Sequence, residues 1–505
     1  MIKPILKYIS AGSRLIISMA SSRYFWYATL GLFITGSLWI ALSGRYPMAF
    51  DENYHLGLIQ LYANGWLPVF GNQPAGADVY GAVARDPSYL YHYLMSFPYR
   101  LMQAAGLQLT ATIVGLRLIN IALFVLGLAV YRRVLISVGA SKAMAHTILF
   151  LVSILPVSVF LAAQINYDNL FFLISAVAIL LAVQVLQDKF NTSRLLLLVL
   201  VCTIGCLVKF SFLPIAVVIL VYLLFSYILS PDISLKNFIK SFNRMPRVTL
   251  FVVSALILLF VGLNLERYGR NLIDYKSPVP DCALVLGAER CKSYGPWNRN
   301  NFLLAKAETT PTFDDNIITF SHEWEFSIFR SAFFAINQDY ITKEPYIVQM
   351  RTAKAVALAG LICFVIWGWR ILQANRRLWL LLLAIILYIG ALFTRNYTEY
   401  QQFETIIAVH GRYLLPIAPL ILLFFGLGLK ELFRAAGAKP ALPVAFLIIG
   451  LIIFQGSGAS IYIRSSDYYW WWQNQKIVEL NEKTQKTLER WTPLDQRLVI
   501  PQDKL

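Results

Sequence analysis

Long apolar runs dominate the sequence and constrain the fold more than any other feature. The stretches 24–42, 118–131, 248–263 and 441–461 contain no charged residue. A helix that crosses a lipid bilayer needs roughly 20 mainly apolar residues. Only 14% of all residues are charged, whereas a soluble domain has about 25%. We therefore expect an all-α integral membrane protein with about eleven transmembrane helices.

The positions of the positive charges predict how the helices are oriented. The chain carries a net charge of +17, and its Lys and Arg residues gather in alternate short segments, as cytoplasmic loops do. We place the N-terminus and these segments in the cytoplasm, for a multi-pass protein of the cytoplasmic (inner) membrane. Topology thus explains the charge, and nucleic acid is not an expected partner. The basic segments are 3–23, 132–142, 189–194, 236–247, 370–377 and 430–439.

The same rule divides the chain into five parts. Residues 1–23 form an amphipathic cytoplasmic segment, and 24–265 form a first module of seven helices with an external loop at 44–112. That loop is expected to carry two juxtamembrane helices, near 54–64 and 88–103. Residues 266–351 form a second external loop, 352–462 contain four more helices, and 463–505 form an external tail with a surface helix expected at 474–490. The expected spans are 24–42, 113–134, 143–163, 167–187, 195–208, 211–230, 248–265, 352–369, 378–394, 413–429 and 440–462.

Cys282 and Cys291 lie together in the second external loop. A disulfide forms readily in an oxidising compartment, so we expect one here, with two separate thiols as the alternative. The other three cysteines lie in apolar runs, where they are expected to pack as small apolar residues.

Two acidic motifs follow predicted helix ends on the external side. Asp51-Glu52 comes directly after the first helix, and His55 follows one helical turn later. Paired carboxylates can act as a general base, a metal ligand or a hydroxyl anchor. Asp168, in Asn166-Tyr167-Asp168, lies in a short loop next to the hydrocarbon, where ionisable residues are usually functional. The structural alternative for both motifs is the capping of a helix N-terminus.

Two cationic motifs lie on the same side. Lys209 lies between two apolar half-helices, where its ammonium group is well placed to bind a phosphate. Alternatively, its side chain extends to the membrane–water interface. His410-Gly411-Arg412-Tyr413 precedes the tenth helix, and the guanidinium of Arg412 can form a fork onto a phosphate or contact a lipid headgroup. A looser cluster, His322, Glu323, Glu325 and Arg330, lies in the second external loop.

All four motifs face one compartment under a charge rule that does not use them. Two acids and two cations in one site suit transfer from a phosphate-activated donor to an acceptor hydroxyl. The acid takes the proton, and the cations stabilise the departing phosphate. Competing hypotheses are a transporter, flippase or polymerase of lipid-linked saccharides, and a scaffold or receptor built on the second external loop.

The motifs resemble those of the GT-C superfamily of polytopic glycosyltransferases, in the branch of the protein O-mannosyltransferases and the lipid A aminoarabinose transferase. An uncharacterised, largely bacterial family of that superfamily is especially similar. Residues 51–55 echo its DExxH motif, and Gly65 and Pro68 follow. The matching motifs continue with Leu155-Pro156, Asn166-Tyr167-Asp168, Lys209 and Gly411-Arg412-Tyr413-Leu414-Leu415-Pro416.

This resemblance implies a GT-C-like helix bundle that moves a sugar from a polyprenyl-phosphate donor, with inversion, to an extracytoplasmic acceptor that is a lipid, a glycan or a protein. Membrane lipids are expected partners as well. Asp51 would be the base or hydroxyl ligand, Glu52 its support and Asp168 the second acid. The superfamily has metal-dependent and metal-free members, so a divalent Mg²⁺ or Mn²⁺ between Asp51 and Asp168 is left open. The remaining candidates, expected to bind substrate, are His55, Lys209, Arg330, His410, Arg412 and Tyr413.

Overall fold

The regular structure of this chain is helical. The structure is a computed structural model that describes residues 15–188, 191–229, 246–307, 316–334, 347–435 and 468–491, together with Gly450, Tyr462, Ile463 and Ser466. Within these ranges every named element is a helix, and one isolated β-bridge pairs Gly44 with Trp471. The predicted all-α class is therefore confirmed.

Seven helices of the described part are long and apolar enough to cross a membrane. They are Arg23–Ser43 (α2), Leu109–Ser137 (α5), Tyr167–Gln187 (α8), Phe210–Ile228 (η2 and α10), Arg247–Tyr275 (α12, η3 and α13), Thr352–Ala374 within α18 (Ile347–Ala374) and Arg377–Phe403 (α19). An eighth span results if Lys142–Ile154 (α6) and Pro156–Ala162 (α7), bent by 70°, form one crossing. The protein is thus a multi-pass membrane protein, and its described residues contain seven or eight candidate spans.

The expected number of eleven spans is not confirmed, for three separate reasons. α9 (Thr192–Val208) has only 17 residues, which is short for a crossing. α20 (Ala418–Ala435) carries Lys430, Glu431 and Arg434 within its 18 residues, and charges are costly in hydrocarbon. The span expected at 440–462 lies largely outside the described residues, as does the N-terminal segment up to residue 14.

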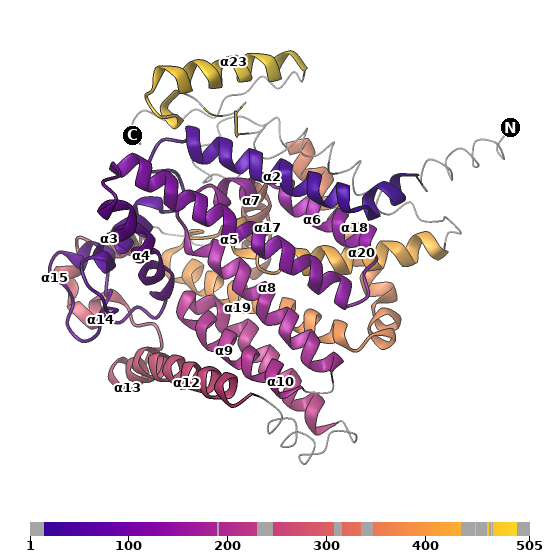
Figure 1. The fold of residues 1–505 in the computed structure, drawn as a ribbon, viewed down its shortest axis with the longest axis horizontal. Helices are drawn as coiled ribbons and strands as arrows, with labels where there is room; N and C mark the ends of the chain where they lie inside the picture. The colour runs from indigo at the N-terminus through magenta and orange to yellow at the C-terminus, as the bar shows by residue number, and fades with distance from the viewer. Residues whose placement is uncertain are drawn as a thin grey trace.

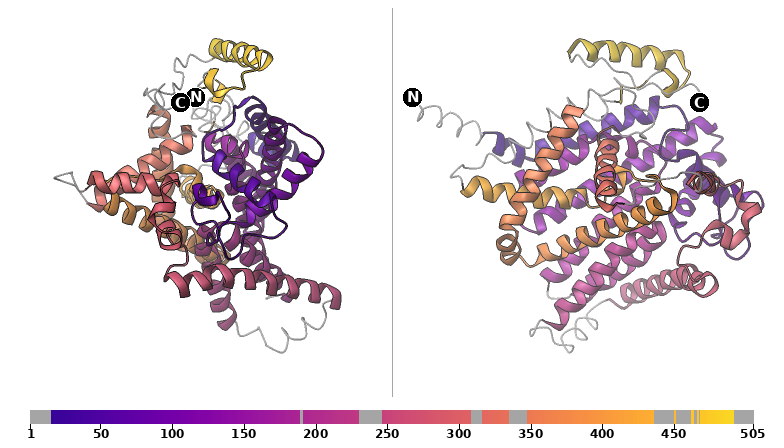
Figure 2. Two further views of the ribbon diagram at one scale, coloured as in Figure 1. Left: turned by 90° about the vertical axis from the view of Figure 1, so that its left-hand side faces the viewer. Right: turned by 180° about the vertical axis from the view of Figure 1, so that it is seen from behind.

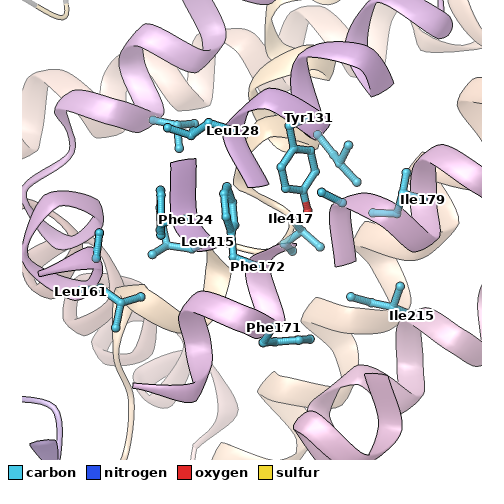
Figure 3. Packing of buried hydrophobic residues seen from close by; sticks show 14 of the residues in the cluster. Phe124, Leu128, Tyr131, Leu161, Phe171, Phe172, Ile179, Ile215, Leu415 and Ile417 are labelled. Atoms are coloured by element: carbon cyan, nitrogen blue, oxygen red, sulfur yellow. The ribbon is translucent and has the colours of Figure 1, made fainter. Parts of the chain in front are cut away.

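The core of the bundle forms where α5, α8, α9 and α10 lie side by side (Figure 1). Phe124 of α5 stacks on Phe172 of α8, with the ring centroids 4.3 Å apart. Leu415, from the segment after η5 (Gly411–Leu414), packs close to both rings (Figure 3). The hydroxyl of Tyr131 donates a hydrogen bond to the carbonyl of Pro416 in the same segment. The core therefore holds the chain that follows Arg412 in place.

The loop between α2 and α5, residues 44–108, folds into a small helical module at one end of the bundle. It contains Glu52–Ala63 (α3), Ala77–Tyr80 (η1) and Leu90–Ala104 (α4), on the left of Figure 1. The two α-helices were expected near 54–64 and 88–103. α2 and α9 end here, whereas α5, α8 and α10 begin here. We call this end of the bundle the α3–α4 end.

Residues after α12 (Arg247–Asn264) pack onto the α3–α4 end. They form Leu265–Gly269 (η3), Arg270–Tyr275 (α13), Cys282–Leu286 (α14), Ala288–Cys291 (α15) and Gly295–Ala307 (α16), and Ile317–Phe334 (α17) follows. A disulfide joins Cys282 to Cys291. Next to it, Arg290 donates two hydrogen bonds to Asp78 of η1, at 2.8 and 2.7 Å. The second loop is thus fastened to the first.

The C-terminal tail returns to the end of α2. The backbone N–H of Arg45 donates to the carbonyl of Trp470 at 2.8 Å, and that of Trp472 donates to the carbonyl of Ser43 at 2.9 Å. Tyr468–Trp470 (η6) precedes Gln475–Trp491 (α23), which lies along one edge of the molecule (Figure 2). A surface helix was expected at 474–490.

Candidate functional site

Four charged side chains that the sequence singled out meet at the α3–α4 end. Each lies at a helix boundary: Asp51 precedes α3, Asp168 lies in the first turn of α8, Lys209 follows α9 and Arg412 lies in η5, which precedes α20. Successive helices reverse direction here, so residues far apart in sequence converge. The side chains of Asp51 and Arg412, 361 positions apart, are in contact.

Asp51 lies in an unusual backbone segment. Both Phe50 and Asp51 have a φ of 64°, in the left-handed region that residues other than glycine rarely adopt. The Asp51 carboxylate does not cap α3, so the capping alternative fails. The side chain is 66% exposed, and its Oδ2 accepts a hydrogen bond from Nη2 of Arg412 at 3.2 Å. Asp51 is therefore an accessible carboxylate beside a cation.

Glu52, the next residue, has a different environment. Its side chain is fully buried and accepts hydrogen bonds from Nε and Nη2 of Arg117, at 2.8 and 2.7 Å. The backbone N–H groups of Met48 and Ile165 donate to the same carboxylate, at 2.8 and 3.2 Å. Arg117 also donates to two carbonyls at the end of α2. This geometry favours a positioning role for Glu52, because its carboxylate already accepts four hydrogen bonds.

Asp168 also does not cap its helix. Asn166 does so instead, since its Oδ1 accepts a hydrogen bond from the Asp168 N–H at 2.9 Å. The Asp168 side chain is 5% exposed and faces two cations. Its Oδ1 accepts a hydrogen bond from the Lys209 ammonium, and its Oδ2 lies 3.7 Å from Nε of Arg412. Asp168 thus holds both cations in one place.

Aromatic rings enclose the two cations. Nζ of Lys209 lies 4.4 Å from the ring centre of Tyr167 and 4.9 Å from that of Tyr413. The guanidinium of Arg412 lies 4.8 Å from the ring centre of Phe50. Such faces attract cations, more strongly where water is excluded. The Lys209 side chain is 6% exposed, so it does not reach out to the interface as the alternative required.

The cluster contains buried polar atoms that have no hydrogen-bond partner. These are Nε and Nη1 of Arg412, Oδ2 of Asp168 and Nε2 of His410. Leaving a buried donor or acceptor unsatisfied costs about 1–3 kcal/mol, so such atoms are rare in folded proteins. Among these atoms, Nε and Nη1 of Arg412 are donors whose hydrogen-bonding capacity is unused.

A cavity of about 380 Å³ opens beside Lys209. Its wall combines the rings of Tyr167, Tyr388 and Tyr413 with an ion pair from α19, in which Nε of Arg395 lies 3.1 Å from Glu399. The sequence did not single out these α19 residues, because charges after an apolar span look like ordinary interface contacts. Apolar walls and cations suit an amphiphilic phosphate. The wall also includes Phe210, Ser211, Leu213, Pro214, Ala391, Leu392, Asn396 and Ala408.

His55 belongs to a buried histidine pair. Its Nδ1 lies 2.8 Å from Nε2 of His92, and its ring packs against Tyr167 at 4.8 Å. Burial, the neighbouring His92 and the charges of Arg412 and Lys209 hold the pKa of His55 well below its usual range. Burial lowers the pKa of His92 to about 3. Both rings are neutral at pH 7, and His55 supports the tyrosine that faces Lys209.

The segment before α20 brings two more predicted residues to the cluster. Nδ1 of His410 accepts a hydrogen bond from the Arg412 N–H at 3.1 Å, and the Tyr413 hydroxyl lies 3.4 Å from Nη2 of Arg412. Burial, followed by the charge of Arg412, keeps the pKa of His410 well below its ordinary value. Arg330 lies on α17, with its guanidinium 5.9 Å from the ring centre of Phe326. The contacts described for the four charged side chains do not include it.

The residues of the cluster do not fit a divalent metal ion. In the described part of the chain, no group of three His, Cys, Asp or Glu side chains is arranged to hold one. Mg²⁺ and Mn²⁺ prefer oxygen ligands, yet both oxygens of Asp168 face cationic nitrogens. The metal that the family resemblance left open therefore lacks a suitable donor set between Asp51 and Asp168.

Two solved structures are similar to most of this chain. One is the archaeal oligosaccharyltransferase AglB from Archaeoglobus fulgidus in complex with an inhibitory peptide and a dolichol-phosphate, at 14% identity and a TM-score of 0.41, covering 95% of this chain and 61% of that one. The other is the Archaeoglobus fulgidus oligosaccharyltransferase in complex with Zn and sulfate, at 13% identity and a TM-score of 0.42, covering 94% and 58%. The chain spans about three fifths of either protein's length. This likeness is too distant to carry an argument.

A family model gives a firmer result. No curated protein matches the chain. The family described as "Predicted membrane protein (DUF2142)" matches residues 85–421, which is about two thirds of the 505 residues. The match includes Asp168, Lys209 and Arg412, whereas Asp51 and Glu52 precede it. The chain belongs to this family of predicted membrane proteins.

Proposed function

We propose that this protein is a GT-C glycosyltransferase that moves a sugar from a polyprenyl-phosphate carrier to an acceptor hydroxyl on the extracytoplasmic side. The observation that carries the proposal is one accessible carboxylate next to two buried cations. Asp51 is 66% exposed, whereas Lys209 and Arg412 are 6% and 9% exposed. The motifs that resemble the GT-C superfamily supply these residues, and the fold brings them together.

The roles follow from exposure and charge. The Asp51 carboxylate takes the proton of the acceptor hydroxyl as its oxygen attacks the anomeric carbon. The attack comes from the face opposite the phosphate, so the configuration inverts. The bond between that carbon and the phosphate oxygen breaks, and its electron pair stays on the phosphate. Lys209 and Arg412 stabilise the added negative charge, because their positions are set before the reaction starts.

The cavity beside Lys209 gives the carrier lipid a place to bind. Tyr167 and Tyr413 line it near the cation, and Leu213, Pro214 and Leu392 make other parts of its wall apolar. A polyprenyl phosphate has the same division, with a charged head and an apolar chain. In this proposal Asp168 does not transfer a proton. Its carboxylate contacts Lys209 and Arg412 and positions both cations for the phosphate.

The experiment that tests the proposal replaces Asp51 with Asn in the full-length protein. Transfer of labelled sugar from synthetic polyprenyl-phosphate hexoses and pentoses is measured in reconstituted membranes. Loss of a general base lowers turnover by roughly 10²–10⁴-fold, and we expect a loss in that range with an unchanged unfolding temperature. Glu289→Gln is the control, since Glu289 is an 84% exposed carboxylate on α15.

Two outcomes would contradict the proposal. Full transfer activity in Asp51→Asn would remove Asp51 from the mechanism. Movement of a lipid-linked saccharide across liposomes, with no covalent transfer by the unaltered protein, would identify a transporter instead.

A further inference from the structure

The guanidinium of Arg412 lies next to the two carboxylates of the cluster. It lies between two carboxylates, with Nη2 at 3.2 Å from Oδ2 of Asp51 and Nε at 3.7 Å from Oδ2 of Asp168. In metal-dependent phosphate chemistry, a divalent cation is held by one or two carboxylates and by the substrate phosphate. A guanidinium is permanently charged and forms paired hydrogen bonds to the same two kinds of group.

The charges of the cluster leave little room for an added cation. Asp51 and Asp168 contribute two negative charges, and Lys209 and Arg412 contribute two positive ones. A divalent ion between the acids would lie within a few ångströms of two buried cations, and repulsion at such distances is strong where water is excluded. If the ion displaced Arg412 instead, it would leave a cationic side chain that is only 9% exposed without its acidic partners, which is costly.

Arg412 also retains unused hydrogen-bonding capacity. Its Nε and Nη1 are buried and have no hydrogen-bond partner. These are the donors that a phosphate oxygen would accept from, so the same side chain bridges the acids and presents two N–H groups to a ligand. A metal ion in such a site would combine the same two tasks.

We infer that Arg412 replaces a divalent metal ion in this site, and that the enzyme transfers sugar from a donor with a single phosphate without any metal. The inference rests on the proposed function. A sugar-phosphate-lipid diester carries one negative charge, and the departing phosphate monoester carries two. Asp51 loses its negative charge when it takes the acceptor proton, so the total charge of site and substrate is unchanged. With Asp168 counted, site and phosphate together keep a net charge of −1 throughout, and Lys209 and Arg412 stabilise the charge that moves onto the departing phosphate.

The test combines activity with a direct measurement of metal binding. Full-length protein in lipid nanodiscs is treated with EDTA, and sugar transfer is measured with and without added MnCl₂. Binding of Mn²⁺ to the unaltered protein and to Asp51→Asn is followed by electron paramagnetic resonance. EDTA is expected to change kcat/KM by less than about twofold, well below the contribution of a catalytic metal. Any bound Mn²⁺ is expected to be the same in both proteins, as for an adventitious ion.

Either of two results would overturn the inference. One is a loss of activity of about tenfold or more with EDTA, an effect of the size that a lost metal contact produces, reversed by Mn²⁺. The other is one tightly bound Mn²⁺ that Asp51→Asn abolishes. If the unaltered protein transfers no sugar, the proposed function fails, but the Mn²⁺ measurement still decides whether Arg412 excludes a metal.

Discussion

Two acid–base clusters lie next to each other at the start of α3, and they differ in how fully their polar atoms are satisfied. Glu52 and Arg117 are both fully buried, and four N–H groups donate to the Glu52 carboxylate. One residue earlier, Asp51 is mostly exposed, and its partner Arg412 keeps two buried nitrogens without a hydrogen-bond partner. Neighbouring carboxylates of the same charge therefore lie in different environments.

The backbone explains how the two carboxylates separate. The left-handed conformation of Phe50 and Asp51 directs the chain so that Asp51 faces Arg412 while Glu52 faces the end of α2. Non-glycine residues adopt this conformation at a cost of order 1–3 kcal/mol, typically at functional sites. A satisfied pair that anchors the loop offsets such a cost. The comparison indicates that Glu52 and Arg117 hold the site in shape for Asp51 and Arg412.

The largest expected effect is on stability, from Glu52→Gln. The substitution keeps the shape of the side chain but leaves the buried charge of Arg117 without its counterion, which costs about 3–5 kcal/mol. Thermal unfolding of the purified protein measures the loss. Asp51→Asn should change stability by no more than about 0.5 kcal/mol, as surface substitutions usually do. Equal effects of the two substitutions would show that the clusters do not differ as described.

A smaller loss is expected from Gly411→Ala, which alters how the Arg412 segment docks. A Cβ at Gly411 would lie 2.6 Å from the backbone nitrogen of Ala332 and 2.7 Å from the carbonyl oxygen of Ile328, both on α17. Overpacking of this kind costs about 1–3 kcal/mol, and a displaced Arg412 should lower transfer as well. Gly390→Ala is the control, because nothing lies within 4 Å of its added Cβ. Unchanged stability and activity in Gly411→Ala would show that the contact of Gly411 with α17 does not position Arg412.

The smallest expected effect concerns pH and the neutral histidines next to the cluster. Burial lowers the pKa of His92 to about 3, whereas the unfolded chain takes up a proton near pH 6.5. Protonation of the unfolded state therefore favours unfolding as the pH falls, by about 1 kcal/mol between pH 7.5 and 6 for this residue. Thermal unfolding at both values measures the change, and His92→Gln should reduce it. If stability rose on acidification instead, His92 could not be the buried, neutral histidine described here.

The sequence allowed the fold class and the four charged positions to be predicted, because apolar runs and helix ends are recognisable from neighbouring residues. The residues that each charged side chain contacts could not be predicted, because they lie far away in the sequence. Asp168 and Lys209 are 41 residues apart, Glu52 and Arg117 are 65, and Asp51 and Arg412 are 361. Arg117 was not among the predicted site residues, because its sequence neighbours give no sign of its pairing with Glu52. Two of the expected spans were not confirmed, because hydropathy alone does not weigh the charges of α20 or the shortness of α9.

The central claim is that Lys209 and Arg412 together bind the phosphate of a lipid carrier. The most direct measurement is a cryo-electron microscopy structure of the full-length protein with a bound polyprenyl phosphate. The account predicts a phosphate within about 4 Å of both Nζ of Lys209 and the guanidinium of Arg412, as charge-assisted contacts require. A phosphate bound elsewhere, with both cations still paired only to Asp51 and Asp168, would contradict it.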